Sequence, residues 1–198
     1  EEDVTVSCVE GERGKVYEGL LHYEVIQTDL RELPKTRTEI MMNLGNPDMA
    51  FSLASLPVEG IGLARMEFII NTSIKAHPMA LLYPEKTDEK TQRELTALTM
   101  DSEDNRVFFV RALSEGVATI ASSVYPKPCI VRMSDFKSNE YASLIGGEFF
   151  EPREENPMIG FRGASRYSHP DYEEGFAMEC AAMKRVREEM GFDLSLIH

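Results

Sequence analysis

Three arginines lie at or near the ends of short apolar runs, each with glycine or an acidic residue close by. They are Arg65, Arg132 and Arg162, within the segments GIGLARME, CIVRMSD and NPMIGFRG. A planar guanidinium group binds a carboxylate or a phosphate through two parallel hydrogen bonds. Three such groups that converge would hold a small ligand with several negative charges. The sequence therefore predicts an anion site.

Two acidic residues next to these arginines are supporting members of the predicted site. Glu67 follows Arg65 by two residues, so Arg65 either contacts a ligand or pairs with Glu67 or a neighbouring strand. Asp135 follows Arg132 by three residues. Its carboxylate either orients that guanidinium or caps a helix that begins near Ser138, as aspartate often does.

The third arginine has a similar ambiguity. Arg162 lies in a glycine-containing stretch near a turn, where it either contacts a ligand or pairs with Glu154 or Glu155. Before Arg65, Gly60 and Gly62 leave room for a close approach of backbone or ligand.

Composition excludes several classes of function. The 198 residues carry a net charge of −13, which argues against a general nucleic-acid surface, because binding to phosphate backbones needs clustered lysine and arginine. The apolar stretches are shorter than the roughly 20 residues that span a bilayer, so no membrane segment is expected. The chain starts with glutamate rather than methionine, and we expect it to be part of a longer polypeptide.

Cysteine and histidine spacing gives no metal site. Cys8, Cys129 and Cys180 lie far apart without a CxxC motif, which is typical of small buried side chains in a reducing compartment. The four histidines show no paired ligand spacing either. We therefore expect a cytoplasmic protein without a metal site in this segment.

The hydrophobic pattern predicts a hairpin and then alternating strands and helices. The hairpin covers residues 4–20, and strands are expected at 40–44, 61–64, 129–133 and from 194 onward. Helices are expected at 46–54, 66–74 (ended by His77-Pro78), 107–124 and 171–190, the last with Phe176, Cys180, Met183 and Met190 on one stripe. Residues 84–105 are polar and indicate a partly helical surface excursion.

Alternating strands and helices indicate an α/β fold with a parallel sheet, in which ligands bind at the carboxyl ends of the strands. Arg65 and Arg132 fall at such ends. The pattern gives three to four βα units, against eight in a full barrel, so we predict the first half of a (β/α)8 TIM barrel. We assign residues 1–23 to the edge of an upstream domain, 24–36 to a linker and 37–198 to the half-barrel.

Other charged residues and motifs add no chemistry. Arg166 and the run 184–187 are predicted to be solvated helix faces. No nucleophile–base pair, phosphate-binding glycine loop or pair of carboxylates stands out. The residues alone thus predict an anion-binding half-barrel and no reaction.

Four longer segments resemble the phosphoenolpyruvate-utilising enzymes. They are MNLGNP (42–47), EGIGLARMEFIIN (59–71), VRMSDFKSNEY (131–141) and ENPMIGFRG (155–163), and the resemblance covers essentially the whole chain. The segment 134–141 favours the pyruvate, water dikinases within this family.

The resemblance implies a reaction. ATP, pyruvate and water would give phosphoenolpyruvate, AMP and phosphate through a phosphohistidine intermediate carried by a separate domain. Arg65, Arg132 and Arg162 would be substrate-binding residues at the mouth of a barrel, with Glu67 and Asp135 in support. Residues 1–23 would be the edge of the phosphohistidine domain.

The resemblance also implies cofactors and partners. Mg²⁺ and its carboxylate ligands, the ATP site, the phosphohistidine and a proton-donating cysteine would lie outside these 198 residues. The isolated segment would therefore be inactive. Its partners would be pyruvate or phosphoenolpyruvate, the remaining domains of its chain and a second copy in a homodimer, with neither nucleic acid nor a membrane.

Two other readings remain open. The segment could be a non-catalytic dimerisation or interaction module. It could also be the equivalent part of pyruvate phosphate dikinase or of the sugar-phosphotransferase system's phosphoenolpyruvate–protein phosphotransferase.

Overall fold

The computed structural model describes residues 3–9, 13–27, 29–30, 33–102 and 104–197. The chain divides into two compact units, Glu1–Pro34 and Lys35–His198. The boundary falls within the segment 24–36 that composition assigned as a linker. The candidate site lies entirely in the second unit.

The first unit contains a β-hairpin. Strands β1 (Val4–Ser7) and β2 (Lys15–Glu18) pair antiparallel, as the sequence predicted. The hydroxyl of Thr5 donates to the carbonyl of Gly19 at 2.7 Å and ties the end of β2 to β1. Residues 10–12 of the predicted hairpin lie outside the described residues. The assignment of this unit to a phosphohistidine domain stays a prediction.

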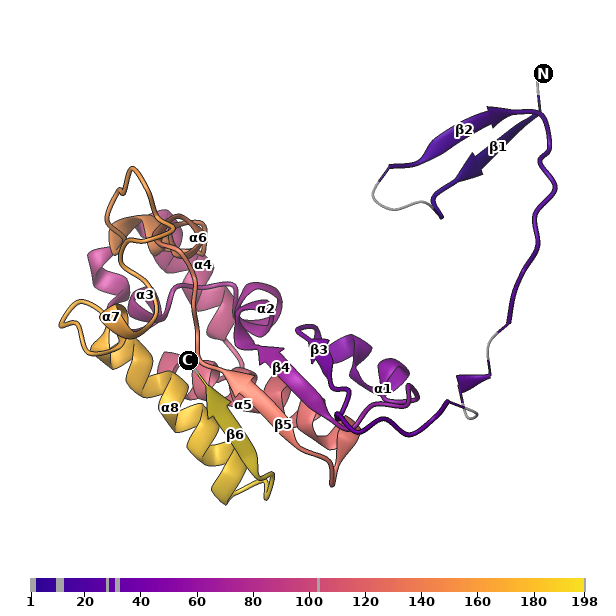
Figure 1. Cartoon of the computed structure of the whole chain (residues 1–198). Helices are drawn as coiled ribbons and strands as arrows, with labels where there is room; N and C mark the ends of the chain where they lie inside the picture. Colours follow the sequence, from indigo (N-terminus) through magenta and orange to yellow (C-terminus); the bar gives the residue numbers. More distant parts are fainter. Residues whose placement is uncertain (1–2, 10–12, 28, 31–32, 103, 198) are drawn as a thin grey trace. The chain divides into compact units, whose positions relative to one another are not determined.

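The second unit is built on a four-stranded parallel sheet (Figure 1). The strands are β3 (Met42–Leu44), β4 (Ile61–Arg65), β5 (Cys129–Arg132) and β6 (Leu194–Ile197), and each pairs with the next in chain order. All four carboxyl ends therefore lie at one edge of the sheet. The mixed α/β class and the parallel sheet predicted from the sequence are confirmed.

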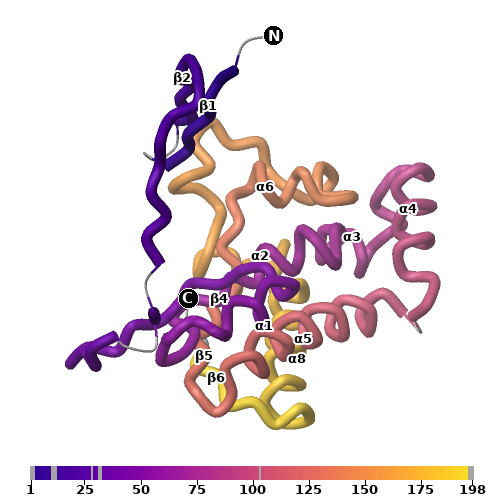
Figure 2. Tube along the Cα trace, turned by 90° about the vertical axis from the view of Figure 1, so that its right-hand side faces the viewer, coloured from indigo at the N-terminus to yellow at the C-terminus, as the bar shows by residue number. Residues whose placement is uncertain are grey.

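Helices connect these strands. In chain order they are η2 (Pro47–Met49), α1 (Ala50–Leu53), α2 (Met66–Ile69), the π-type η3 (Ile70–Ile74), α3 (Pro78–Leu82), η4 (Pro84–Lys86), α4 (Glu89–Thr99), α5 (Asn105–Val124), α6 (Ser138–Ala142), η5 (Gly147–Phe149), α7 (Ala164–Tyr167) and α8 (Glu173–Glu188). Figure 2 shows α5 and α8 near one another in a view at right angles to Figure 1, and the two helices pack together.

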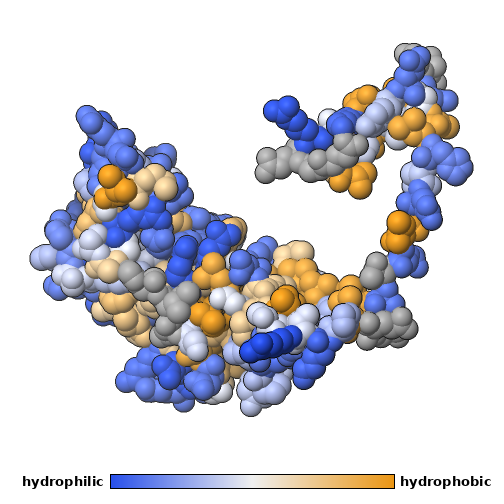
Figure 3. Space-filling model, viewed as in Figure 1, coloured by the Kyte–Doolittle hydropathy of each residue, from blue (hydrophilic) through white to orange (hydrophobic). Residues whose placement is uncertain are grey.

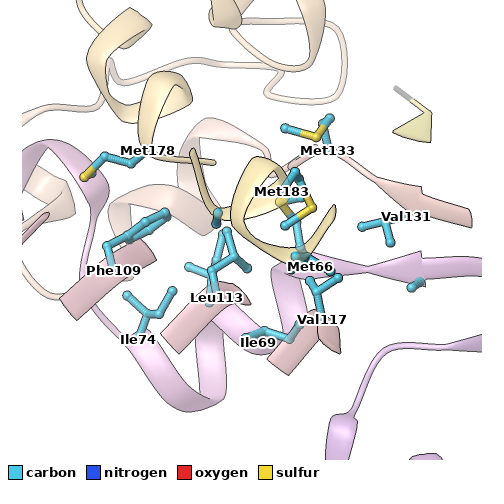
Figure 4. Close-up of a cluster of buried hydrophobic side chains, with 14 of the residues drawn as sticks. Met66, Ile69, Ile74, Phe109, Leu113, Val117, Val131, Met133, Met178 and Met183 are labelled. Carbon is cyan, nitrogen blue, oxygen red and sulfur yellow. The ribbon is translucent and has the colours of Figure 1, made fainter. Parts of the chain in front are cut away.

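The core lies where α5 meets the sheet, α2 and α8. Figure 4 shows Phe109, Leu113 and Val117 of α5 among buried residues of the neighbouring elements, including Ile69 and Met183. These side chains are 1% exposed or less. Burial of such apolar side chains stabilises the fold by about 2 kcal/mol each.

Helix α5 also meets the length and hydropathy of a membrane span, with 20 residues and an 18-residue stretch of mean hydropathy 1.4. This was not expected from the short apolar runs. Its apolar sequence contains the charged residues Arg111 and Glu115, and one face of the helix is buried against α8. We therefore interpret α5 as the central core helix of the second unit.

Strand β5 shows how the two faces of the sheet differ. Cys129 and Val131 are buried, whereas Ile130 and Arg132 are half-buried. Successive side chains point to opposite faces of a strand, so one face of β5 is covered and the other is partly open. In Figure 3, apolar surface is visible among hydrophilic groups in the middle part of the second unit.

One helix was not predicted from the sequence. The helix expected at 66–74 is present as α2 and η3 and ends before His77 and Pro78, but Pro78 begins a further helix, α3. The ring nitrogen Nδ1 of buried His77 accepts a hydrogen bond from the amide of Met79 at 3.1 Å and caps the helix. Proline is well tolerated at the first helical position because its missing N–H needs no partner there.

The predicted stripe on the last helix is also out of phase. Met183 is buried, but Phe176 and Met190 are only half-buried and Cys180 is exposed. The buried face of α8 instead contains Gly175, Met178, Glu179, Ala182, Met183 and Val186. Of the three cysteines, only Cys129 is buried; Cys8 and Cys180 are exposed, which differs from the expectation.

Candidate functional site

Strands β4 and β5 carry two of the predicted arginines to the same point. Arg65 and Arg132 are register partners at the carboxyl ends of these neighbouring parallel strands. Both line a pocket of about 350 Å³, together with Arg162. Glu67 and Asp135 line the same pocket. All five residues that the sequence singled out are thus brought together.

Arg132 is held by two carboxylates. Its Nη2 donates to Oε1 of Glu67, which is 7% exposed, and its Nη1 lies 3.6 Å from Oδ2 of Asp135. Glu67 therefore pairs with Arg132 and not with Arg65. The Nε of Arg132 and the Oε2 of Glu67 are buried without a hydrogen-bond partner among the described residues.

Asp135 connects Arg132 to Arg162. The Nε and Nη2 of Arg162 donate to the two carboxylate oxygens of Asp135, each at 2.9 Å, in a bidentate ion pair. Hydrogen bonding to this carboxylate raises the pKa of Arg162. The N-cap position of α6 is occupied by Lys137, not by Asp135. Glu140 accepts a hydrogen bond from the amide of Lys137 at the start of that helix.

The alternative pairing of Arg162 with Glu154 or Glu155 is not formed. Glu154 accepts a hydrogen bond from the amide of Phe161 at 2.9 Å and so shapes the backbone that leads to Arg162. Arg162 pairs instead with Asp135, which lies 27 positions earlier in the sequence. Spacing along the chain gave no signal for this pair.

Arg65 differs from the other two arginines. Within the described residues, the structure records no hydrogen bond or ion pair for its side chain. Its guanidinium carbon lies 4.5 Å from the centre of the Phe68 ring. The exposed charge of Arg65 is therefore available to an anion without displacing a carboxylate.

Sequence reasoning missed other residues of the pocket, which are Phe68, Asn71, Phe136, Lys137 and Glu140. The lysine Nζ lies 3.5 Å from a carboxylate oxygen of Glu140. All five lie within the segments that carry the family resemblance, so these segments were the sequence feature from which the five could have been identified. The pocket contains four basic and three acidic side chains, so a dianion would meet a net positive charge.

The glycines before Arg65 face other parts of the protein: Gly60 lies against the backbone of Pro128 and Gly62 against the side chain of Met41. Gly60 has φ +141°, and a Cβ there would lie 2.3 Å from the carbonyl oxygen of Pro128. That carbonyl accepts a hydrogen bond from the amide of Ile61 at 2.9 Å. Gly60 thus allows β4 and β5 to pair at the end of the strands opposite to Arg65.

Arg166 is buried, which corrects the prediction of a solvated residue. Its side chain is 1% exposed and forms a bidentate ion pair with Glu151. The guanidinium carbon lies 4.2 Å from the ring centres of both Tyr141 and Phe161. Its Nη2 also donates to the carbonyl of Phe161 at 2.9 Å, directly before Arg162.

His77 completes this buried cluster. Its Nε2 lies 2.9 Å from Oε1 of Glu151, and burial lowers the pKa of the imidazole despite this contact. Although burial acts to raise the pKa of Glu151, hydrogen bonds from Arg166 and His77 lower it overall. The cluster thus contains an ionised carboxylate between an arginine and a histidine, and it supports the segment that carries Arg162.

The described residues do not fit a bound metal ion by themselves. No group of three or more histidine, cysteine, aspartate or glutamate side chains lies close enough to hold one in the described part of the chain. Mg²⁺ requires several oxygen ligands in octahedral geometry. In the pocket, Glu67 and Asp135 are already engaged by guanidinium and amide groups.

A larger hollow of about 670 Å³ lies away from the arginines. It is lined by α8 and the residues that follow it, among them Phe176, Met183 and Phe192. Its charged lining residues are two cations, Lys184 and Arg187, and two anions, Glu188 and Asp193, so it has no net positive charge. We therefore regard the smaller pocket as the candidate site.

Comparisons with known proteins agree with the sequence motifs. Residues 23–196 match the family model described as "PEP-utilising enzyme, PEP-binding domain". The chain is 58% identical to a phosphoenolpyruvate synthase of Synechocystis and 52% identical to one of Escherichia coli, over 96% of its length in both cases. It is 42% identical, over 92% of its length, to a probable phosphoenolpyruvate synthase of Staphylothermus marinus.

The chain spans only about a quarter of the length of these relatives, 24% for the first two and 22% for the third. The family match itself covers most of the chain and includes every arginine of the pocket. On this evidence, the chain belongs to the PEP-utilising enzyme family and contains its PEP-binding domain.

Proposed function

We propose that this chain forms part of the pyruvate and phosphoenolpyruvate site of a phosphoenolpyruvate synthase. The observation that carries the proposal is the common pocket of Arg65, Arg132 and Arg162 at the carboxyl edge of a parallel sheet. Phosphoenolpyruvate carries a carboxylate and a phosphate, and guanidinium groups bind both through paired hydrogen bonds. Relatives named phosphoenolpyruvate synthase support this choice of ligand.

We propose further that the second unit is the first half of a (β/α)8 barrel. Its four parallel strands follow one another in chain order without a reversal, as barrel strands do. Strand β5 has one covered face and one partly open face, which fits an interior that further strands would enclose. The fold thus accounts for a substrate site at the carboxyl ends of the strands.

The proposed reaction of the whole enzyme converts ATP, pyruvate and water to phosphoenolpyruvate, AMP and phosphate through a phosphohistidine. Here the residues of this chain bind and orient the substrate and neutralise charge on the transferred phosphoryl group. Arg65 offers a guanidinium that forms no ion pair with any described residue, while Asp135 fixes the orientations of Arg132 and Arg162. The phosphohistidine, the ATP site and the Mg²⁺ ligands would come from other parts of the protein, so this segment alone would not catalyse the reaction.

Arg65→Ala is the sharpest test, because no described ion pair is lost with this side chain. In the full-length protein, we expect phosphoenolpyruvate to bind roughly ten- to hundredfold more weakly, the factor that corresponds to a lost hydrogen bond to a charged group. Isothermal titration calorimetry would measure the Kd.

Arg93→Ala is the matched control, because Arg93 is an exposed arginine of α4 that pairs with Glu89 and does not line the arginine pocket. It should leave the affinity unchanged. Equal affinities of the wild type and Arg65→Ala for phosphoenolpyruvate would rule out the proposed role of the pocket.

A further inference from the structure

Two buried glutamates hold consecutive amides of the turn that follows β5. Glu67 of α2 accepts a hydrogen bond from the amide of Asp135 at 2.9 Å. Glu179 of α8 accepts one from the amide of Ser134 at 3.2 Å. The turn that carries Asp135 is therefore fixed from two helices. Glu67 lines the arginine pocket, whereas Glu179 does not.

Ser134 is bound at each of its polar atoms. Its hydroxyl oxygen lies 2.6 Å from Oε1 of Glu179 and 2.7 Å from the hydroxyl of Tyr141. Its carbonyl accepts a hydrogen bond from the hydroxyl of Tyr167 at 2.7 Å. Since the amide is also held by Glu179, neither peptide group beside Ser134 can rotate without breaking a hydrogen bond.

Glu179 is completely buried within the apolar face of α8. Burial is the main cause that raises the pKa of its carboxyl, to about 7. Burying such a group is costly, and an apolar side chain of similar size would fill the same space without that cost. The carboxyl group, unlike an apolar side chain, forms hydrogen bonds with Ser134 and with the hydroxyl of Tyr172, which lies 2.9 Å from Oε1.

Asp135, the residue after Ser134, links two arginines of the pocket. Asp135 contacts Nη1 of Arg132 and forms the bidentate pair with Arg162. A small rotation of the turn would move this carboxylate and, with it, both guanidinium groups. Charge-assisted bidentate pairs depend strongly on geometry, so such a movement would disturb the pocket.

We propose that Glu179 is a positioning residue of the phosphoenolpyruvate site, acting through Ser134 on Asp135 and its two arginines. It does not line the pocket itself. The inference rests on the proposed function, because it concerns the same pocket. It adds a residue on a different helix that determines how well the site is formed.

The test compares two substitutions in the full-length protein. Glu179→Gln keeps an acceptor for the amide of Ser134, while Glu179→Leu fills the space but holds nothing. We expect the Gln variant to bind phosphoenolpyruvate within about threefold of the wild type and the Leu variant roughly tenfold or more weakly. Hydrogen exchange at the amides of Ser134 and Asp135 should be faster in the Leu variant, even where its melting temperature matches the wild type.

Glu188→Leu on the exposed side of the same helix is the control and should change neither property. If Glu179→Leu does not fold, Ser134→Ala takes its place, because it removes the hydroxyl that Glu179 holds. A folded variant of either kind that binds phosphoenolpyruvate like the wild type would overturn the inference.

Failure of the proposed function has a different signature. If the wild type does not bind phosphoenolpyruvate, or if Arg65→Ala binds it normally, the pocket is not the substrate site and both proposals fall. If Arg65→Ala loses affinity but Glu179→Leu does not, only the positioning role of Glu179 is wrong.

Discussion

At the scale of single residues, Glu179 makes the stability of the fold depend on pH. Burial is the largest cause that raises its pKa, from the usual 4.5 to about 7, while hydrogen bonds from Ser134 and Tyr172 act in the opposite direction. The folded protein therefore favours the protonated carboxyl more than the unfolded chain does. This contribution to stability is complete below pH 4.5 and is lost as the pH rises through 7.

Glu179→Gln removes this dependence, because glutamine resembles the protonated carboxyl and does not titrate. The difference between the two pKa values corresponds to roughly 3 kcal/mol. We expect the Gln variant to match the wild type near pH 4 and to exceed it in free energy of unfolding near pH 8. Urea denaturation across this pH range measures the difference, and a constant difference would show that Glu179 does not titrate differently on folding.

At the scale of elements, the short helix α7 and the segment before it depend on Arg166. This side chain connects Glu151, the aromatic rings of Tyr141 and Phe161, and the carbonyl next to Arg162. Removing one partner of a buried ion pair leaves the other charge uncompensated.

Arg166→Ala should lower the free energy of unfolding by about 3–5 kcal/mol, as measured by chemical denaturation. Arg166→Lys keeps the charge but loses the bidentate geometry, so we expect it to be destabilising as well. Arg153→Ala, in an exposed position of the same segment, serves as the control and should have little effect. Unchanged stability of Arg166→Ala would contradict the role assigned to the cluster.

The sequence predicted these elements unevenly, for physical reasons. The strands and the long helices were predictable because hydrophobic periodicity is local, and Arg65 and Arg132 were predictable because they follow apolar runs. Arg166 was mistaken for a surface residue, since its partner Glu151 lies 15 positions away. No pattern within a few residues of Arg166 records that contact.

Glu179 was missed although a signal existed. It follows Gly175 by four residues and precedes Met183 by four, so it lies on the buried stripe of α8. The bulky Phe176 and Cys180 suggested a stripe displaced by one position. The phase of an amphipathic helix is hard to fix when small residues such as Gly175 face the core. The assignment of these residues to ligand binding, and of the sheet to a barrel, stays a prediction.

At the scale of the whole molecule, a cationic pocket is formed within a strongly acidic chain. The net charge is −13, so the overall field repels anions, and the pocket must attract them locally. A ligand that binds only the folded state stabilises it by mass action.

We therefore expect phosphoenolpyruvate at about 100 times its Kd to stabilise the full-length protein by about 2.7 kcal/mol. A thermal shift assay would record a higher Tm for the wild type and a rise at most about half as large for Arg65→Ala at the same ligand concentration, because the variant binds at least tenfold more weakly. Sodium chloride at equal ionic strength is the control for general screening. A shift of the same size in the Arg65 variant would place the bound anion elsewhere.

The stacking of Arg65 on Phe68 has a consequence for how a ligand arrives. An aromatic ring holds the guanidinium in place without neutralising it, whereas Arg132 and Arg162 are already engaged by carboxylates. An incoming anion can contact Arg65 first, because this side chain has no ion pair with a described residue that must break. The anion can then bind the remaining N–H groups of the other two arginines. Capture and final alignment of the ligand would thus be separate steps, carried out by different arginines of one pocket.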